Sequence, residues 1–283
     1  MRLSSRLVSS LAVVATACAV APAVSAAAVD GPDPTVTSLR ANLGPYPISR
    51  TGYTDAATPG FGAGSVYYPT GATKPLGVVA FAPGFTENSS AVSWLAQRVA
   101  SHGFVTIAFN VNNTWTDFPY SRAGQLLAAI DFVTTSSKER NIADASRTAV
   151  VGHSMGGGGT LDASRLRPEL KAAVGLAPWN PGLQYDDVTV PALEIGAQND
   201  FIAPVAQNAR VFYNSLPGST PKTLAVLKGA GHFATNSPTA KVGAATVAWL
   251  KRYVDGDTRY APFICGAHTA VFPSELSSYS SNC

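Results

Sequence analysis

The stretch Thr148-Ala149-Val150-Val151-Gly152-His153-Ser154-Met155-Gly156 carries the clearest signal in this chain of 283 residues. Its first four residues are apolar or β-branched, which predicts a buried strand. The rest reads G-x-S-x-G, a pattern typical of a sharp turn from a strand into a helix with the serine at its tip. Glycine on both sides lets strand and helix approach closely while the serine adopts a positive φ. We therefore predict that Ser154 is a catalytic nucleophile; the alternative is an ordinary Gly/Ser turn.

Apolar β-rich runs alternate with helical patterns along the chain, which predicts an α/β fold with a mostly parallel sheet and helices on both faces. The predicted strands are 64–68, 76–81, 104–109, 148–151, 172–177, 192–196 and 223–227. The predicted helices are 92–101, 121–135, 156–166, 204–216 and 239–254. Only about 13 residues separate the strands 172–177 and 192–196, too few for a lid domain. Without an internal repeat or a low-complexity linker, residues 27–283 are expected to form a single domain.

The N-terminus has the pattern of a secretory signal peptide, predicted over residues 1–26 with the cleavage site uncertain by a few residues. Arg2 and Arg6 precede an apolar, Ala-rich run that Pro22 interrupts, which argues against a stable membrane anchor. Acylation at Cys18 is the lipoprotein alternative, but the leucine usual three residues earlier is missing. Loss of the two arginines lowers Lys+Arg from 20 to 18 against 17 Asp+Glu, so the formal charge falls from +3 to +1. A nearly neutral mature protein gives no reason to expect a nucleic-acid partner.

The mature chain keeps two cysteines, Cys265 and Cys283, both near the C-terminus. An even pair in an exported protein most simply forms a disulfide, worth about 3 kcal/mol by loop entropy. A catalytic cysteine would need an adjacent base, and neither position offers one.

A serine hydroxyl becomes a good nucleophile only when a base accepts its proton and an anion orients that base. Of the four histidines, His232 follows the strand 223–227 in a glycine-containing loop, at the strand end where ligands collect in open α/β sheets. His102 has the setting of a structural or surface residue, His153 points away from the serine and can only support the site, and His268 lies in the tail. Asp200 directly follows the strand 192–196 and is the expected acid. The carboxylates at 186, 187, 255 and 257 are read as solvated loop residues.

The anionic intermediate of acyl transfer needs two preorganised N–H donors. The backbone amide of Met155, at the start of the helix, is one expected donor. The other is the amide of Phe85, in the turn after the strand 76–81. Trp179 follows the neighbouring strand and could stack on an acyl or aromatic group; its alternative is an ordinary core tryptophan.

Beyond the elbow, several segments make the mature chain resemble the actinobacterial cutinases, a family of polyester hydrolases and lipases with the α/β-hydrolase fold. The segments are 152–159 (GHSMGGGG), 177–179 (APW), 202–205 (IAPV), 212–216 (FYNSL), 249–252 (WLKR), 257–260 (DTRY) and the terminal cysteine pair. The order Ser154, Asp200, His232 is also the order of α/β-hydrolases. The resemblance implies hydrolysis of cutin, triacylglycerols, short p-nitrophenyl esters and, in many members, polyethylene terephthalate.

Carried over by position, the resemblance gives Ser154, Asp200 and His232 the catalytic roles and places Trp179 and Ile202 along the acyl cleft. Three substrate-binding positions depart from the family's pattern. Phe85 stands where tyrosine is common, Asn208 where a histidine often lies beside the tryptophan, and Phe118 at a position polar in many relatives. Lys228 replaces an acidic residue with which some relatives bind calcium, so no metal site is carried over.

The sequence therefore predicts a secreted, lidless, monomeric serine ester hydrolase that needs no cofactor. Its expected substrates are insoluble polyesters (cutin and polyethylene terephthalate), lipid esters, and short- to medium-chain acyl esters. The main alternative is a triacylglycerol lipase or short-chain carboxylesterase with little polyester activity. A catalytically silent surface-binding protein or a peptidase is disfavoured, because the triad is intact and no cap domain is present to select peptides.

Overall fold

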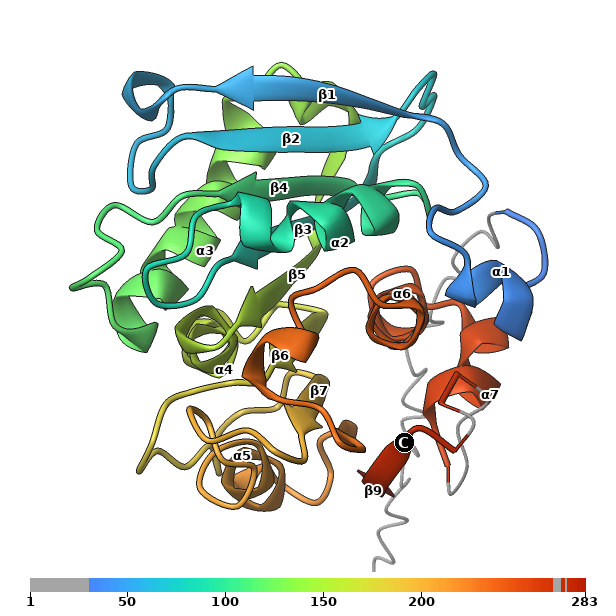
Figure 1. Ribbon diagram of the computed structural model, residues 1–283. Coiled ribbons are helices and arrows are strands. Elements are labelled where there is room, and N and C mark those ends of the chain that lie inside the picture. Colours follow the sequence, from blue (N-terminus) through green and yellow to red (C-terminus); the bar gives the residue numbers. More distant parts are fainter. Residues whose placement is uncertain (1–30, 267–270, 273) are drawn as a thin grey trace, which may run out of the picture.

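The computed structural model describes residues 31–266, 271–272 and 274–283 (Figure 1). The predicted signal peptide, Cys18 and His268 lie outside these residues. The described strands form one sheet in the order β1-β2-β4-β3-β5-β6-β7-β8-β9. The strands from β3 to β8 pair in parallel, whereas β1, β2 and β9 pair antiparallel at the two edges. Their bounds are β1 Ile48–Tyr53, β2 Gly64–Pro69, β3 Leu76–Ala82, β4 Val105–Phe109, β5 Ala143–His153, β6 Ala172–Leu176, β7 Ala192–Ala197, β8 Lys222–Leu227 and β9 Leu276–Ser281.

Helices cover both faces of this sheet (Figure 1). On one face α2 and α6 pack into the cluster around Leu95 and Trp249; on the other, α3 and α4 pack into the cluster around Leu126 and Leu161. The bounds are α1 Val36–Arg40, α2 Ser90–Ala100, α3 Pro119–Thr135, α4 Met155–Leu166, α5 Ala209–Ser215, α6 Ala240–Tyr253 and α7 Ala261–Ile264. Single 3₁₀ turns span Asp55–Ala57, Arg140–Ile142, His232–Ala234 and Thr258–Tyr260. The predicted α/β class is confirmed.

The central strands are apolar along their whole length because helices bury both of their faces. Every residue of β3, β4 and β6 is buried. Each of the seven predicted strands is present within a few residues of its expected bounds. No helix lies between β6 and β7, where a lid would be inserted. The described chain is therefore lidless, as predicted.

One helix prediction is wrong at its start. The periodicity predicts a helix over 204–216, but α5 begins only at Ala209. Residues before it form a turn in which the Pro204 carbonyl accepts hydrogen bonds from the amides of Gln207 and Asn208. Asn208 itself has φ −128° and ψ −95°, outside the helical region, so the pattern cannot run through it.

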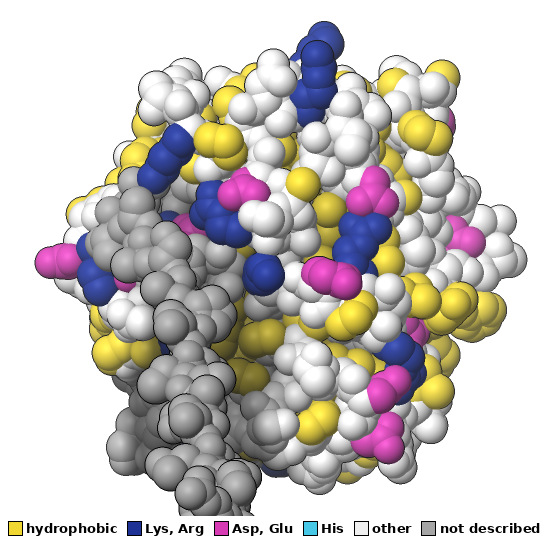
Figure 2. All heavy atoms as spheres, turned by 180° about the vertical axis from the view of Figure 1, so that it is seen from behind, with side chains coloured by type: hydrophobic (Ala, Val, Ile, Leu, Met, Phe, Trp, Pro, Cys, Tyr) yellow, Lys and Arg dark blue, Asp and Glu magenta, His cyan; other side chains and the backbone are white. Residues whose placement is uncertain are grey.

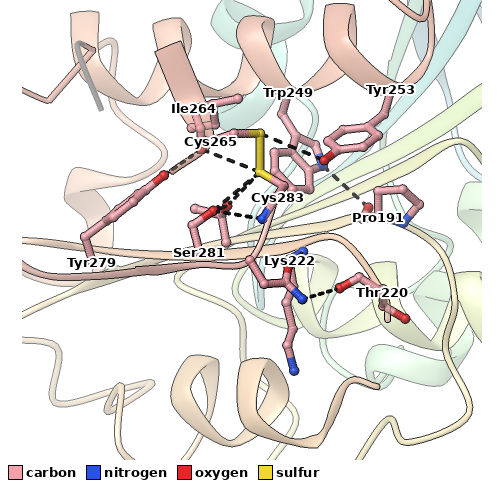
Figure 3. Close-up of a disulfide and its surroundings, with 12 residues drawn as sticks. Pro191, Thr220, Lys222, Trp249, Tyr253, Ile264, Cys265, Tyr279, Ser281 and Cys283 are labelled. Carbon is pink, nitrogen blue, oxygen red and sulfur yellow. Dashed lines mark hydrogen bonds between the residues drawn. A yellow bond between two sulfur atoms is a disulfide. The ribbon is translucent and has the colours of Figure 1, made fainter. Parts of the chain in front are cut away.

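A disulfide joins Cys265 and Cys283 in the C-terminal tail, as expected (Figure 3). It joins the end of α7 to the residues after β9, the strand that closes the β8 edge. The Tyr279 hydroxyl donates to the Ile264 carbonyl at 2.6 Å beside the bridge. Among the described residues visible in Figure 2, positive and negative side chains lie next to one another, without a large area of one sign.

Candidate active site

Ser154 lies at the turn between β5 and α4, at the carboxyl end of the parallel strands. Its φ of +55° is one of few positive values at non-glycine residues in the described chain. The glycines on either side are required by contact: a Cβ at Gly152 would lie 2.2 Å from the Gly156 backbone. A Cβ at Gly156 would lie 2.5 Å from the carbonyl oxygens of Ala82 and Pro83 in the turn after β3. The sequence thus folds into a strained turn that presents the serine at the edge of the sheet.

Asp200 and His232 come from the ends of the next strands. Asp200 follows β7, and His232 begins the 3₁₀ turn after β8; His232 Nδ1 and Asp200 Oδ2 are 2.7 Å apart. The other carboxylate oxygen accepts from the amides of Ile202 and Ala203 at 2.9 and 2.7 Å. Burial alone would raise the pKa of Asp200, but the hydrogen bonds from His232 and the two amides outweigh it and hold this pKa below its usual value. The buried carboxylate is thus ionised beside the ring that it orients.

Ser154 and His232 are both buried, and each follows the carboxyl end of a parallel strand. The described residues show no hydrogen bond between the Ser154 hydroxyl and the His232 ring. His153, the neighbour of Ser154, packs on His232 with the ring centroids 4.8 Å apart. In the absence of substrate such serine–histidine contacts are often long and shorten only in the reactive complex.

The two expected N–H donors border the serine. Met155 begins α4, so its amide has no partner within the helix. The amide of Phe85 makes none of the backbone hydrogen bonds found among the described residues. The turn that carries it is held by the buried Arg122, whose Nη1 donates to the Pro83 carbonyl at 2.9 Å. Among the described residues, neither amide thus has a hydrogen-bond partner, and both can serve as donors.

A half-buried glutamate at this site was not identified from the sequence. The side chain of Glu87, in the turn after β3, lies 2.9 Å from His153 Nδ1 and accepts from the Gly84 amide at 2.6 Å. Loop carboxylates are normally solvated, and its spacing from the triad matches no motif, so only the fold shows that it is enclosed.

The predicted substrate-binding residues separate into exposed and buried positions. Phe85, Phe118 and Ile202 are exposed at the carboxyl edge of the sheet, and Trp179 is half-buried with its amide donating to the Ser154 carbonyl at 2.8 Å. Asn208 is different, because only 1% of it is exposed.

The Asn208 side chain serves a neighbouring loop. Its Oδ1 accepts from the Asn180 amide and its Nδ2 donates to the Pro204 carbonyl. We therefore correct the expectation that Asn208 binds substrate directly: a side chain without exposed surface supports the loop that follows Trp179. A histidine here has a ring larger than the buried Asn208 side chain, so the loop around it would have to pack differently.

Several exposed aromatic side chains that were not predicted from the sequence also lie around the site. Trp115 packs edge-on against Phe85 with the ring centroids 5.4 Å apart, and 68% of Trp115 is exposed. Tyr120, Phe201 and Phe233 are also exposed. Trp115 lies shortly before Pro119 and Phe201 directly follows Asp200. An aromatic residue in a loop after a predicted strand was the sequence signal that could have identified them. A groove of about 440 Å³ beside them is lined by Phe118, Pro119, Tyr120, Asp162, Arg165, Trp179, Asn180, Pro181 and Leu183.

The described residues hold no group of three or more His, Cys, Asp or Glu side chains placed to bind a metal ion. In the same part of the chain, no helix combines the length and the apolar character needed to cross a bilayer. His102 is buried in the turn between α2 and β4, away from Ser154.

Known proteins give this geometry a context. A family model described as PET hydrolase-like matches residues 23–283. Cutinase est1 of Thermobifida alba is 48% identical over 255 residues, covering 89% of this chain and 86% of that protein. Cutinase 2 of Thermobifida cellulosilytica is 48% identical over 256 residues, covering 89% and 97%. Bis(hydroxyethyl) terephthalate hydrolase of Streptomyces coelicolor is 45% identical over 236 residues, covering 83% and 76%. The chain therefore belongs to the PET hydrolase-like family of α/β-hydrolases and is a carboxylic ester hydrolase.

Proposed function

We propose that this protein is a secreted serine hydrolase that cleaves polyester chains, cutin and polyethylene terephthalate among them, through an acyl-enzyme. Residues 1–26 would direct export and be removed. Short- and medium-chain acyl esters are expected as further substrates, because the same chemistry applies to any ester carbonyl that reaches the serine.

The reaction follows from the positions of three side chains. Ser154 Oγ attacks the ester carbonyl carbon while His232 Nε2 takes its proton, and Asp200 keeps the ring oriented through Nδ1. The amides of Phe85 and Met155 hold the oxyanion that forms.

Two collapse steps then complete the cycle. The tetrahedral intermediate first breaks the ester C–O bond, and the leaving alcohol takes the proton from His232. Water next attacks the acyl-enzyme with His232 again as base, which releases the carboxylic acid and restores Ser154. No cofactor takes part in this scheme.

The distribution of exposed apolar side chains supports a polymer substrate. Apart from Leu43 and Leu166, the large exposed apolar side chains of the described chain lie beyond the carboxyl ends of β3, β4, β6, β7 and β8. They are Phe85, Trp115, Phe118, Tyr120, Leu183, Phe201, Ile202 and Phe233, here called the aromatic rim. Most are in loops, whereas Tyr120 is in the first turn of α3 and Phe233 in the 3₁₀ turn after β8. Exposed apolar patches of this kind mark interaction sites. An uncovered site with such a rim suits a substrate that cannot enter a closed pocket.

The test is release of soluble products from cutin and from polyethylene terephthalate film, beside a soluble butyrate ester and a tributyrin plate. We expect products from the films with the wild type and none with Ser154→Ala. Hydrolysis of the soluble esters without release from either film would instead identify a lipase or short-chain esterase. Film products that persist in Ser154→Ala would contradict the proposed nucleophile.

A further inference from the structure

The carboxylate of Glu87 connects three segments of the active site. Oε2 accepts from the Gly84 amide at 2.6 Å, in the turn that carries Phe85, and lies 2.9 Å from His153 Nδ1. Oε1 accepts from Asn236 Nδ2 at 2.6 Å, in the loop after His232. One side chain therefore contacts the turn after β3, the elbow beside Ser154, and the loop that carries the base.

His153 extends this connection to the catalytic histidine. It is completely buried, and its Nε2 lies 3.4 Å from the carbonyl oxygen of His232. Its ring also packs on the His232 ring at a centroid distance of 4.8 Å. A shift of His153 would therefore move both the backbone and the ring of His232.

The connection is tightly packed and anchored at its outer end. A Cβ at Gly84 would lie 2.8 Å from Glu87 Oε2 and 3.0 Å from both His153 Nδ1 and the Ser154 Cβ, so no space separates these groups. At the outer end, the Asn236 carbonyl accepts from Trp94 Nε1 on α2 at 2.7 Å. The base loop is thus attached both to a helix of the scaffold and to Glu87.

The charge of Glu87 is compatible with this arrangement. Burial by itself would raise the pKa of Glu87, but hydrogen bonds and charge attraction from His153, with the Gly84 amide, lower it below its usual value. An ionised carboxylate only accepts hydrogen bonds, and here a donor approaches from each segment.

We propose that Glu87 is a positioning residue, which holds the Phe85 amide and the His232 ring in register with Ser154 through His153 and Asn236. This inference rests on the proposed function, because it assumes that the Phe85 amide and His232 act on the reacting ester. Small displacements of such groups are costly, since about 1 Å of misplacement can lower a rate about a hundredfold.

The first test is Glu87→Gln, which keeps the size of the side chain. A glutamine has one acceptor oxygen, so its NH₂ group must face a donor on one side and a link is lost. We expect kcat on a soluble p-nitrophenyl ester to fall by about tenfold to a hundredfold, with KM changed less than about twofold. Attack of Ser154 on a p-nitrophenyl phosphonate, which forms the Oγ–P bond and expels p-nitrophenol, should slow by a similar factor.

Glu139→Gln is the matched control. Glu139 is buried and, like Glu87, accepts several hydrogen bonds: the Thr51 and Tyr53 hydroxyls donate to it at 2.6 and 2.7 Å. It precedes β5, at the opposite edge of the sheet. This variant should lose stability and keep both rates. If Glu87→Gln keeps kcat, or loses no more than Glu139→Gln, the positioning role is refuted.

Asn236→Ala provides a second test that does not depend on folding of the Glu87 variant. It removes only the link to the base loop, and we expect kcat to fall about threefold to tenfold with KM unchanged; an unchanged kcat would overturn the proposal. Ser154→Ala distinguishes failure of the positioning role of Glu87 from failure of the proposed function. If Ser154→Ala still hydrolyses the ester, the nucleophile is misassigned whatever Glu87 does.

Discussion

Buried or half-buried carboxylates occur both at the carboxyl edge of the sheet and in its interior, and their surroundings differ. At the edge, Asp200 and Glu87 each accept several hydrogen bonds, and their pKa values lie below the usual range. In the interior, Glu194 of β7 is fully buried, and neither of its oxygens has a hydrogen-bond partner among the described residues. Burial alone raises its pKa well above the usual value.

The difference teaches where this fold keeps ionised groups. Hydrogen-bond donors placed around a buried carboxylate favour its charged form, and for Asp200 and Glu87 these donors lie at or just beyond the carboxyl ends of the strands. Within the sheet the backbone donors are already used by neighbouring strands. Glu194 is therefore neutral at pH values near the usual pKa of a glutamate. It has no evident role in the reaction, whereas the edge carboxylates orient the catalytic groups.

The largest effect should come from removing charge at the edge. In Asp200→Asn, a neutral amide no longer stabilises the charged ring of His232 and favours the wrong tautomer, so kcat should fall about a thousandfold or more. Steady-state hydrolysis of a soluble butyrate ester at neutral pH measures this. A loss of less than about tenfold would mean that Asp200 does not orient the base.

The same variant should respond differently to acid. Because the pKa of Asp200 is lowered by folding, its contribution to stability is present above the usual Asp value of about 3.9 and is lost as the pH falls through the lower folded value. The melting temperature of Asp200→Asn should therefore depend less on pH in this acidic range than that of the wild type.

How far the sequence predicted these features depends on how local each signal is. The G-x-S-x-G turn and the residues that follow apolar strands predicted the nucleophile, acid and base, and the structure brings Asp200 and His232 into contact. The edge strands β1 and β9 were missed because they are half-exposed and polar, and they form only by pairing with β2 and β8.

The partners of buried polar residues could not be predicted. Glu87 contacts a residue 149 positions away in the chain, and Asn208 is buried by the loop after Trp179. No local pattern encodes such contacts. Glu194 was visible as a lone acid within an apolar strand, but only the fold shows that no donor reaches it.

An intermediate effect is expected at the aromatic rim. Phe118 and Tyr120 are exposed and line the groove beside Trp179. Replacing both by serine should lower product release from film about tenfold, as expected for the loss of about 1.4 kcal/mol of aromatic contact. Hydrolysis of a soluble butyrate ester should change less than about twofold. Leu43→Ser, which alters an exposed apolar residue outside the rim, is the control; an equal loss of film activity in that variant would contradict a role specific to the rim.

The smallest effect concerns the interior carboxyl. Glu194→Met replaces an unpaired acid with an apolar side chain of similar size, and it should stabilise the fold by about 1–3 kcal/mol, or roughly 2–12 °C in Tm. Its kcat should not change. A lower Tm would mean that Glu194 has a stabilising partner.

The pH dependence of Tm sharpens this test. Because folding raises the pKa of Glu194, its contribution to stability is full below the usual Glu value of about 4.3 and declines as the pH rises toward the folded value. Glu194→Gln stays neutral and should lose this decline while keeping an unpaired polar group. The Tm of Glu194→Gln minus that of the wild type should thus be larger at pH 8 than at pH 4.5.

The central claim, that the carboxyl edge of the sheet activates Ser154 as the nucleophile, is tested most directly by mass spectrometry of the protein after reaction with a p-nitrophenyl phosphonate. The account predicts one phosphonyl group per chain, located on the peptide that contains Ser154, with loss of ester hydrolysis in proportion to labelling. Ser154→Ala should remain unlabelled. Labelling at another residue, or complete labelling of Ser154 that leaves ester hydrolysis intact, would contradict the account.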